Sequence, residues 1–83
     1  MAEKEIGRVM SYFSHVEVAA IKLSGKLKVG DKVRFKGHTT NFEQKIESMQ
    51  IDREDVGEAG KGDEVGIKVN DKVRPNDAVL LVK

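Results

Sequence analysis

The chain contains no cysteine and no tryptophan, and only one proline among its 83 residues. Without cysteine, neither disulfide bridges nor thiolate–metal bonds can stabilise a domain of this size. No apolar run approaches the roughly 20 residues that a membrane-spanning helix needs. The first residues also lack the apolar core of a secretory signal peptide. These absences predict a single domain over residues 1–83, located in the cytoplasm and without a membrane partner.

An excess of charge of one sign is lacking as well, because 15 Lys and Arg residues face 14 Asp and Glu residues. This balance excludes a uniformly basic nucleic-acid-binding protein and an acidic disordered tail. The charges are nevertheless distributed unevenly. Residues 22–38 carry six basic side chains and one acidic side chain, whereas residues 43–64 carry eight acidic and three basic side chains. The sequence is therefore dipolar along its length.

Alternation of apolar and polar residues predicts a mostly β structure. In the clearest segment, Val33 and Phe35 alternate with basic residues on either side. The first two predicted strands are rich in β-branched and aromatic residues but alternate imperfectly, which predicts a bulge or a twist within them. The predicted strands are 6–13, 16–23, 32–38, 64–69 and 78–82.

Turn-forming residues separate these segments about every 8–12 residues, a spacing typical of small barrels and sandwiches. Each turn combines glycine, asparagine, aspartate, serine or proline, and the turns lie at 24–25, 30–31, 60–63, 70–71 and 75–77. No crossover helix is visible between strands, which favours antiparallel pairing. Closure of the sheet would remove exposed edges. We therefore predict an all-β fold, a small closed antiparallel β-barrel of about six to seven short strands.

The segment 42–52 does not follow the strand pattern. Phe42, Ile46 and Met49 have the spacing of one helix face, and the pattern alone favours a helix here. A strand requires the inward face to change between Ile46 and Met49, with Phe42, Gln44 and Ile46 pointing inward before the change. The pattern leaves both interpretations open.

The basic segment supplies the candidate binding residues. Side chains on one face of a strand lie about 6–7 Å apart, close to the spacing of successive phosphates in a nucleic-acid strand. The alternative is a solvated face whose cations pair with acidic residues on neighbouring strands. Aromatic residues are too few for base stacking, so any nucleic-acid contact would read backbone and shape. The candidate nucleic-acid-binding residues are Lys22, Lys26, Lys28, Lys32, Arg34 and Lys36.

Patterns that carry catalysis or bind cofactors are missing. The glycines at 57–62 are too closely spaced for a phosphate-binding loop, and no hydroxyl follows the lysine. Ser14 and His15 would point to opposite faces of a strand, and two histidines without cysteine cannot form a closed zinc site. The acidic residues at 52–58 depart from the calcium-loop pattern. We therefore expect them to form a charged loop, or to discourage strand pairing at an edge of the sheet. We therefore predict no enzyme activity, no cofactor, no metal and no nucleotide binding.

Several stretches together resemble domain 2 of translational GTPases, the β-barrel that follows the nucleotide-binding domain in elongation factor Tu and initiation factor two. The matching stretches are 25–33, 46–50, 58–67 and 74–80, in the family order, and the most specific is Ala-Gly-x-Gly-Asp-x-Val-Gly-Ile at 59–67. The chain is also similar to small free-standing proteins called elongation-factor-like, and a related barrel ends some collagenase-like peptidases.

The resemblance has structural and functional implications. It implies a strand at 46–50, so that 42–52 is expected to be strand, and it implies that Gly30, Gly60 and Gly66 stand where a turn or a close strand approach needs no Cβ. Such barrels contact the acceptor end of aminoacyl-tRNA or ribosomal RNA. The resemblance therefore implies a non-catalytic translation module that contacts tRNA or ribosomal RNA through the basic face. The alternative is a protein-interaction accessory module that docks on a separate GTPase or peptidase.

Overall fold

The computed structural model describes residues 3–82, and Met1 and Ala2, on which part of the signal-peptide expectation falls, lie outside the described residues with Lys83. Within residues 3–82 the chain forms ten strands. A search of the same residues finds no helix with the length and hydrophobicity of a membrane span. The strands are β1 (Glu3–Phe13), β2 (Val18–Leu23), β3 (Leu27–Lys28), β4 (Lys32–Lys36), β5 (Asn41–Lys45), β6 (Met49–Ile51), β7 (Glu54–Asp55), β8 (Glu58–Ala59), β9 (Glu64–Lys68) and β10 (Ala78–Val82).

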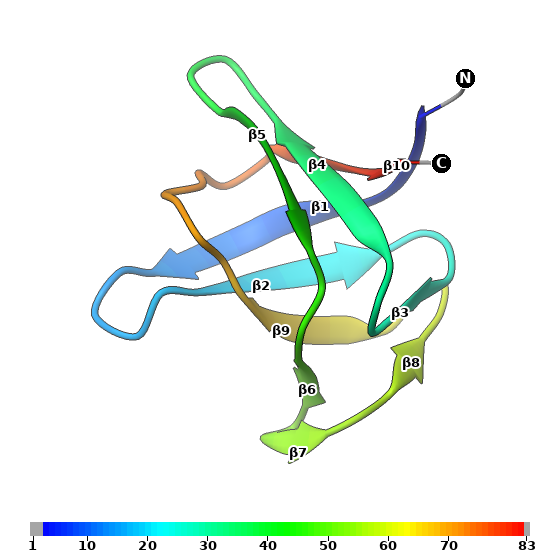
Figure 1. Ribbon diagram of the computed structural model, residues 1–83. Helices are drawn as coiled ribbons and strands as arrows, with labels where there is room; N and C mark the ends of the chain where they lie inside the picture. Colours follow the sequence, from blue (N-terminus) through cyan, green and yellow to red (C-terminus); the bar gives the residue numbers. More distant parts are fainter. Residues whose placement is uncertain (1–2, 83) are drawn as a thin grey trace.

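Eight of these strands form one antiparallel sheet in the order β5-β4-β10-β1-β2-β9-β6-β7, and β3 pairs with β8 separately. The sheet curls, so that β4 and β5 cross over β1 and β2 on the other side of the core (Figure 1). The predicted all-β class is confirmed. The predicted closed barrel is not confirmed, because β5 and β7 end the strand order and no backbone ladder joins them in residues 3–82. The strands outnumber the prediction because four of them are only two or three residues long.

The core lies inside the curl of the sheet. Direct cross-strand pairs place Val33, Val79 and Ile21 on its inner face, and Phe35 stacks on Phe42 with ring centroids 5.1 Å apart. Aromatic pairs of this kind contribute about 0.5–1.5 kcal/mol beyond their buried area. The apolar residues of the alternating pattern, such as Val33 and Phe35, therefore lie on the inner face of the sheet, as predicted.

Most of the segment 42–52 is strand, against the pattern alone, but of the strand that the resemblance implied at 46–50 only residues 49 and 50 are strand. It forms β5 and β6, separated by three residues, and Gln44, Ile46 and Met49 are all buried. The inward face changes between Ile46 and Met49 as the strand interpretation required. Tertiary pairing overrides the helical spacing, because β5 pairs with β4 whereas β6 pairs with β9 at the far side of the sheet.

One side chain bridges the place where the sheet fails to close, between β5 and residues 68–70 at the end of β9. We call this gap the seam. Gln44 Nε2 donates to the carbonyl of Lys68 at 2.9 Å, and the Asn70 amide donates to Gln44 Oε1 at 2.8 Å. The side-chain amide thus makes one donor and one acceptor bond, as a residue of a neighbouring strand would. Gln44 is only 6% exposed, so these bonds satisfy a buried polar group.

Two irregularities in β1 confirm the predicted bulge. The register against β10 shifts between Glu5 and Gly7, and the register against β2 shifts between Val9 and Ser11. The first shift lets Ile6 turn into the core, where it is buried. The second leaves Met10 without a direct partner on β2, so its side chain stands on the outer face.

Three turns share one construction, at residues 28–31, 60–63 and 74–77. In each, the aspartate at the fourth position accepts a hydrogen bond from the first amide through its carboxylate, at 3.1, 2.9 and 2.9 Å respectively. The aspartate amide in turn donates to the first carbonyl. The third position has a positive φ, which is 100° at Gly30, 91° at Gly62 and 76° at Asn76. These turns lie where turn chemistry predicted them.

The glycines differ in part from the expectation. Gly30 fulfils it, but a Cβ on Gly60 would meet no atom within 4 Å, and one on Gly66 would make only an ordinary contact at 3.5 Å. The positions that exclude a side chain are Gly7, where a Cβ would lie 2.8 Å from the Lys22 carbonyl oxygen, and Gly37, where it would overlap the carboxylate of Asp77. Both depend on neighbours distant in sequence.

Candidate interaction surface

Arg34 stands at the centre of an ion-pair network on the outer face of β4. Its Nε donates to Glu3 at 2.6 Å, one terminal nitrogen donates to Asn41 Oδ1 at 3.1 Å, and the other donates to Glu43. Lys32 forms a further ion pair with Glu43 at 3.0 Å. The hydrogen bond from Lys32, followed by the charge of Arg34, holds the pKa of Glu43 below its ordinary value of 4.5.

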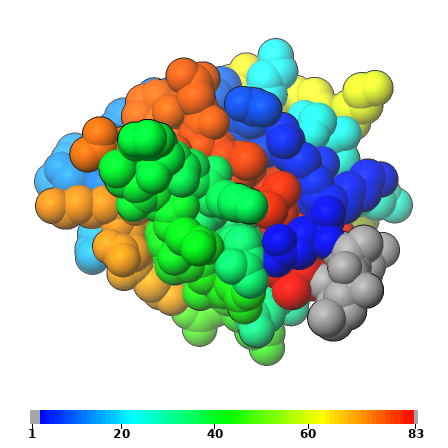
Figure 2. All heavy atoms as spheres, turned by 90° about the horizontal axis from the view of Figure 1, so that it is seen from above, coloured from blue at the N-terminus to red at the C-terminus, as the bar shows by residue number. Residues whose placement is uncertain are grey.

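This network lies across β10, which separates β4 from β1. Arg34 pairs directly with Leu80 of β10, and Glu3 pairs with Val82 from the other side. In the space-filling view the red atoms of β10 are only partly visible between the blue atoms of β1 and the green atoms of β4 (Figure 2). The long stem of Arg34 thus covers apolar surface while its head is paired. Lys32 and Arg34 therefore pair with acidic residues of neighbouring strands, as the alternative to nucleic-acid binding predicted.

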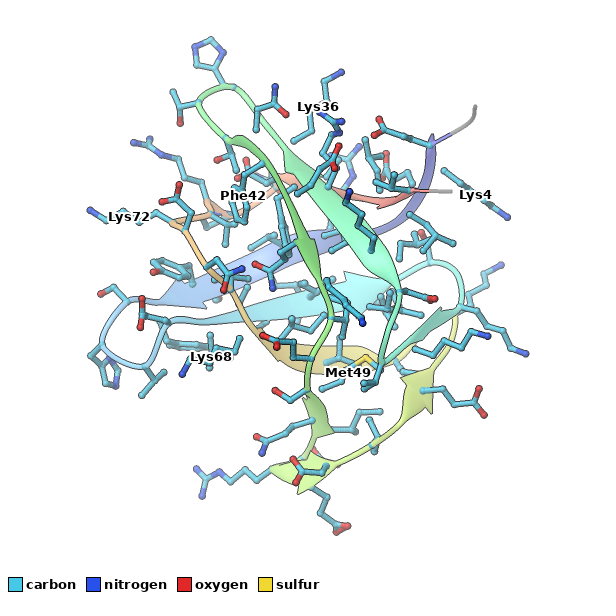
Figure 3. The ribbon with its side chains drawn as sticks, in the orientation of Figure 1. Lys4, Lys36, Phe42, Met49, Lys68 and Lys72 are labelled. Atoms are coloured by element: carbon cyan, nitrogen blue, oxygen red, sulfur yellow. The ribbon has the colours of Figure 1, made fainter. Side chains whose placement is uncertain are left out.

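The six candidate cations do not form one row. Lys22 lies on β2, which is separated from β4 by β1 and β10. Lys26 and Lys28 lie at β3, outside the large sheet. Lys36 points outward at the end of β4 (Figure 3). A nucleic-acid site on these six residues stays a prediction, and the structure supplies no continuous line of unpaired cations for it.

A second surface feature was missed by sequence reasoning. Three exposed large apolar side chains gather at the β1–β2 hairpin: Met10 is 38% exposed, Phe13 is 46% exposed and Val16 is 49% exposed. Direct cross-strand pairs extend this surface over half-buried small residues of β2 and β9. We call it the hairpin patch, and its residues are Met10, Phe13, Val16, Val18, Ala20 and Gly66.

The register explains why these residues face outward. Phe13 pairs with Val18, and Val18 pairs with Lys68, so the three share the outer face. The next row joins Ser11 to Ala20 and Gly66, which are too small to cover their neighbours. Outer faces of antiparallel sheets are usually polar, so an uncharged row of this kind is unusual. The signal in the sequence was the broken alternation of the first two predicted strands, which we assigned to a bulge or a twist.

A shallow hollow continues from the hairpin patch along the same outer face. It has a volume of about 400 Å³, and its lining residues are Glu5, Gly7, Arg8, Lys22, Leu23, Ser24, Lys61 and Gly62. Arg8 pairs with Glu5 at 3.0 Å, whereas neither lysine forms an ion pair within residues 3–82. The hollow therefore presents cationic charge beside the apolar patch.

Groups that could carry chemistry are dispersed in the part of the chain that the structure describes. His15 and His38 are exposed in the turns of two different hairpins. No group of three or more His, Asp or Glu residues in 3–82 is placed to hold a metal ion. The acidic residues Glu54 and Asp55 form β7 at the end of the sheet, where charge discourages pairing with another strand.

Comparison with known proteins connects this fold to two groups. The sequence model of the family described as elongation factor Tu domain 2 matches residues 20–75. The chain therefore belongs to the elongation factor Tu domain 2 family. An uncharacterized protease of Methanocaldococcus jannaschii is 46% identical over 80 residues, which cover 95% of this chain and 20% of the protease. A collagenase of Porphyromonas gingivalis is 38% identical over 74 residues, which cover 87% of this chain and 20% of the collagenase.

Solved structures give the same picture of the fold. The C-terminal domain of a Geobacillus thermoleovorans protein described as a U32 peptidase superposes with a TM-score of 0.91 at 23% identity, covering 96% of this chain and 93% of that domain. Its selenomethionine variant gives a TM-score of 0.87 at 24% identity, covering 92% of this chain and 96% of that chain. The chain spans about a fifth of the length of the curated relatives that it matches.

These comparisons correct the functional prediction. The resemblance to translation-factor domain 2 is confirmed, but the prediction of a translation module that contacts tRNA or ribosomal RNA is wrong, because the relatives are a protease and collagenases. The reason is that a fold hosts many functions, whereas function depends on the site. The peptidase form of the alternative, an accessory module that docks on a peptidase, fits the relatives better, and an RNA partner has no support.

Proposed function

We propose that this chain is a non-catalytic accessory domain of a U32-type peptidase and that it acts by packing against the peptidase region. The observation that carries the proposal is the 46% identity to the M. jannaschii protease over 95% of this chain. The rest of that protease is four times longer than the match, which leaves ample room for a separate catalytic region.

The surface supports an accessory role in place of a catalytic one. Nucleophilic and acid–base catalysis need a nucleophile, a base and an orienting group within hydrogen-bond reach. Ser14 and His15 lie in an exposed hairpin turn. The hollow beside Gly7 is lined by three basic residues and one acidic residue, Glu5, whose carboxylate is paired with Arg8. The hairpin patch is an exposed apolar surface, which is suited to contact with another protein surface.

The test compares three forms of the M. jannaschii protease: the intact protein, a chimera in which this chain replaces the matching 80 residues, and a form with that segment deleted. We expect the chimera to hydrolyse a peptide substrate within about threefold of the intact protein. The deletion should lower kcat/KM at least about tenfold, because docked domains position substrate or catalytic groups. This chain alone should release no product above buffer.

Two results would contradict the proposal. Hydrolysis by the isolated chain would make it a catalyst. A deletion form that matches the intact protein in kcat/KM and in thermal unfolding temperature would show that the segment has no accessory role. The location of this domain in the cytoplasm, inferred from the sequence, stays a separate prediction.

A further inference from the structure

We propose that the hairpin patch is the surface that docks on the peptidase region, and that the region it contacts is apolar opposite the patch and acidic opposite the adjoining hollow. This inference rests on the proposed function, since it names the surface through which the accessory domain would act. It follows from the exposure of the patch, its lack of charge and the cations beside it.

Contact with a partner would bury apolar surface of the hairpin patch without burying a charge of the patch residues. Phe13 and Val16 expose nearly half of their surfaces at the tip of the hairpin, and Met10 adds a flexible side chain at the bulge. Burying apolar surface contributes about 25 cal/mol per Å². The methyl group of Ala20 and the absence of a side chain at Gly66 leave a level area in which a partner's side chains can lie. Aromatic and methionine residues of this kind are enriched at protein interfaces.

The charges around the patch define the chemistry of the partner. Lys22 and Lys61 line the hollow at one end, and Lys68 stands in the patch row, on the outer face of β9 (Figure 3). None of the three forms an ion pair within residues 3–82. Glu64 faces Lys22 across the β2–β9 pair, so the surplus of positive charge is modest. Acidic groups on the partner would complement this surplus and select the orientation of docking.

A second copy of the chain is a poorer occupant. A symmetric contact through the patch would bring the same cations of both copies to the same interface. Such a contact would gain apolar burial but no charge complementarity. In the relatives the matching segment is instead 20% of the whole, so that a stretch four times its length accompanies it in the same chain. We therefore commit to the peptidase region as the occupant.

Hydrogen exchange measured by mass spectrometry tests the inference with complete chains. The free chain and the chimera with the M. jannaschii protease are compared peptide by peptide. The amides of residues 14–17 lie in the hairpin turn and, apart from a long bond from Val16 to Phe13, donate to no backbone carbonyl. Docking through the patch should slow their exchange at least about tenfold in the chimera, because a covered turn loses its access to water.

Two matched variants separate the patch from surface hydrophobicity in general. Val16→Ser removes an apolar group from the patch, and Val29→Ser makes the same change at a side chain of similar exposure, 41% against 49%, in the turn before β4. The protection at 14–17 should decrease in the chimera with Val16→Ser and should persist with Val29→Ser. Addition of Phe13→Ser to Val16→Ser should abolish the protection. Both variant chains should unfold at nearly the wild-type temperature when free, since the altered groups are exposed.

The outcomes distinguish the two proposals. Protection of another surface, with 14–17 unchanged, overturns the hairpin patch as the docking surface and leaves the accessory function standing. Identical exchange of the free chain and the chimera at every peptide overturns both, because the domain would then dock nowhere. Protection at 14–17 that depends on the concentration of the free chain would assign the patch to self-association and overturn the choice of occupant.

Discussion

Gln44→Met is the sharpest test of how this incompletely closed sheet is held together. Methionine matches glutamine in length but can neither donate to the Lys68 carbonyl nor accept from the Asn70 amide. A typical intramolecular hydrogen bond contributes about 0.5–1.5 kcal/mol net. Two lost bonds therefore cost about 1–3 kcal/mol. Lys68 and Asn70 are themselves exposed residues. Water that reaches their two backbone groups in the variant would keep the cost at the lower end of this range.

That loss is large for a domain of this length. One kcal/mol shifts the unfolding temperature of a 60–100-residue domain by about 4–8 °C, so about 2 kcal/mol corresponds to a decrease of about 8–16 °C. Urea unfolding measures the free energy of unfolding. Circular dichroism is the suitable signal, because the chain has no tryptophan whose fluorescence could be followed. Hydrogen exchange adds a local measurement. The amide of Asn70 should exchange faster in the variant than global destabilisation alone explains.

The matched control is Gln50→Met on β6. Gln50 is exposed, and its Nε2 donates to Asp55 Oδ1 at 3.0 Å on the surface. Removal of this bond should change the unfolding free energy by less than about 0.5 kcal/mol. If Gln44→Met is no more destabilising than Gln50→Met, then the seam does not depend on the side-chain amide, and the bridging role we assign to Gln44 is wrong.

Substitutions at three further positions are tested by urea unfolding. Gly37→Ala should lower the unfolding free energy by about 2–4 kcal/mol, because the new Cβ displaces the buried carboxylate of Asp77, and a variant as stable as wild type would contradict the contact. Asn76→Ala should cost about 1 kcal/mol because its φ is 76°, whereas Asn76→Gly should be nearly neutral. Glu43→Gln should be less stable than wild type at neutral pH. The lowered pKa of Glu43 means that its ion pair with Lys32 stabilises the fold above the ordinary value of 4.5, and this difference should vanish as the pH falls below that value. A constant difference from pH 7 to pH 2 would contradict this assignment.

Local patterns predicted what local forces decide. The strand around Val33 and Phe35 follows from alternation, and the three aspartate turns follow from residues that tolerate positive φ or accept a hydrogen bond from a nearby amide. These features depend on contacts within a few residues of the chain. They would form in the same way in many sequences that share the local pattern.

Long-range features were beyond single-sequence reasoning for a definite reason. The hydrogen bonds of Gln44 join residues 24 and 26 positions apart, and Gly37 and Asp77 are 40 positions apart in the sequence. The apolar spacing of 42–52 looks helical because the segment changes its pairing partner within a few residues. Its first part, β5, pairs with β4, and its last part, β6, pairs with β9. Only the strand order contains that information, and the resemblance to a known family supplied part of it.

Arg34 shows why a basic strand is ambiguous until its register is known. The same alternation that suggested a line of phosphate ligands also places each cation opposite a residue of the next strand. The β4–β5 hairpin sets Glu43 directly opposite Arg34, and β10 brings Glu3 within reach from the other side. A guanidinium held by two carboxylates on an exposed face gains little stability, since surface ion pairs contribute about 0–1 kcal/mol. It is nevertheless unavailable to a phosphate without breaking both bonds. The cations at Lys32 and Arg34 on the outer face of β4 are therefore occupied by the protein's own carboxylates, whereas the lysines beside the hairpin patch form no ion pair within residues 3–82.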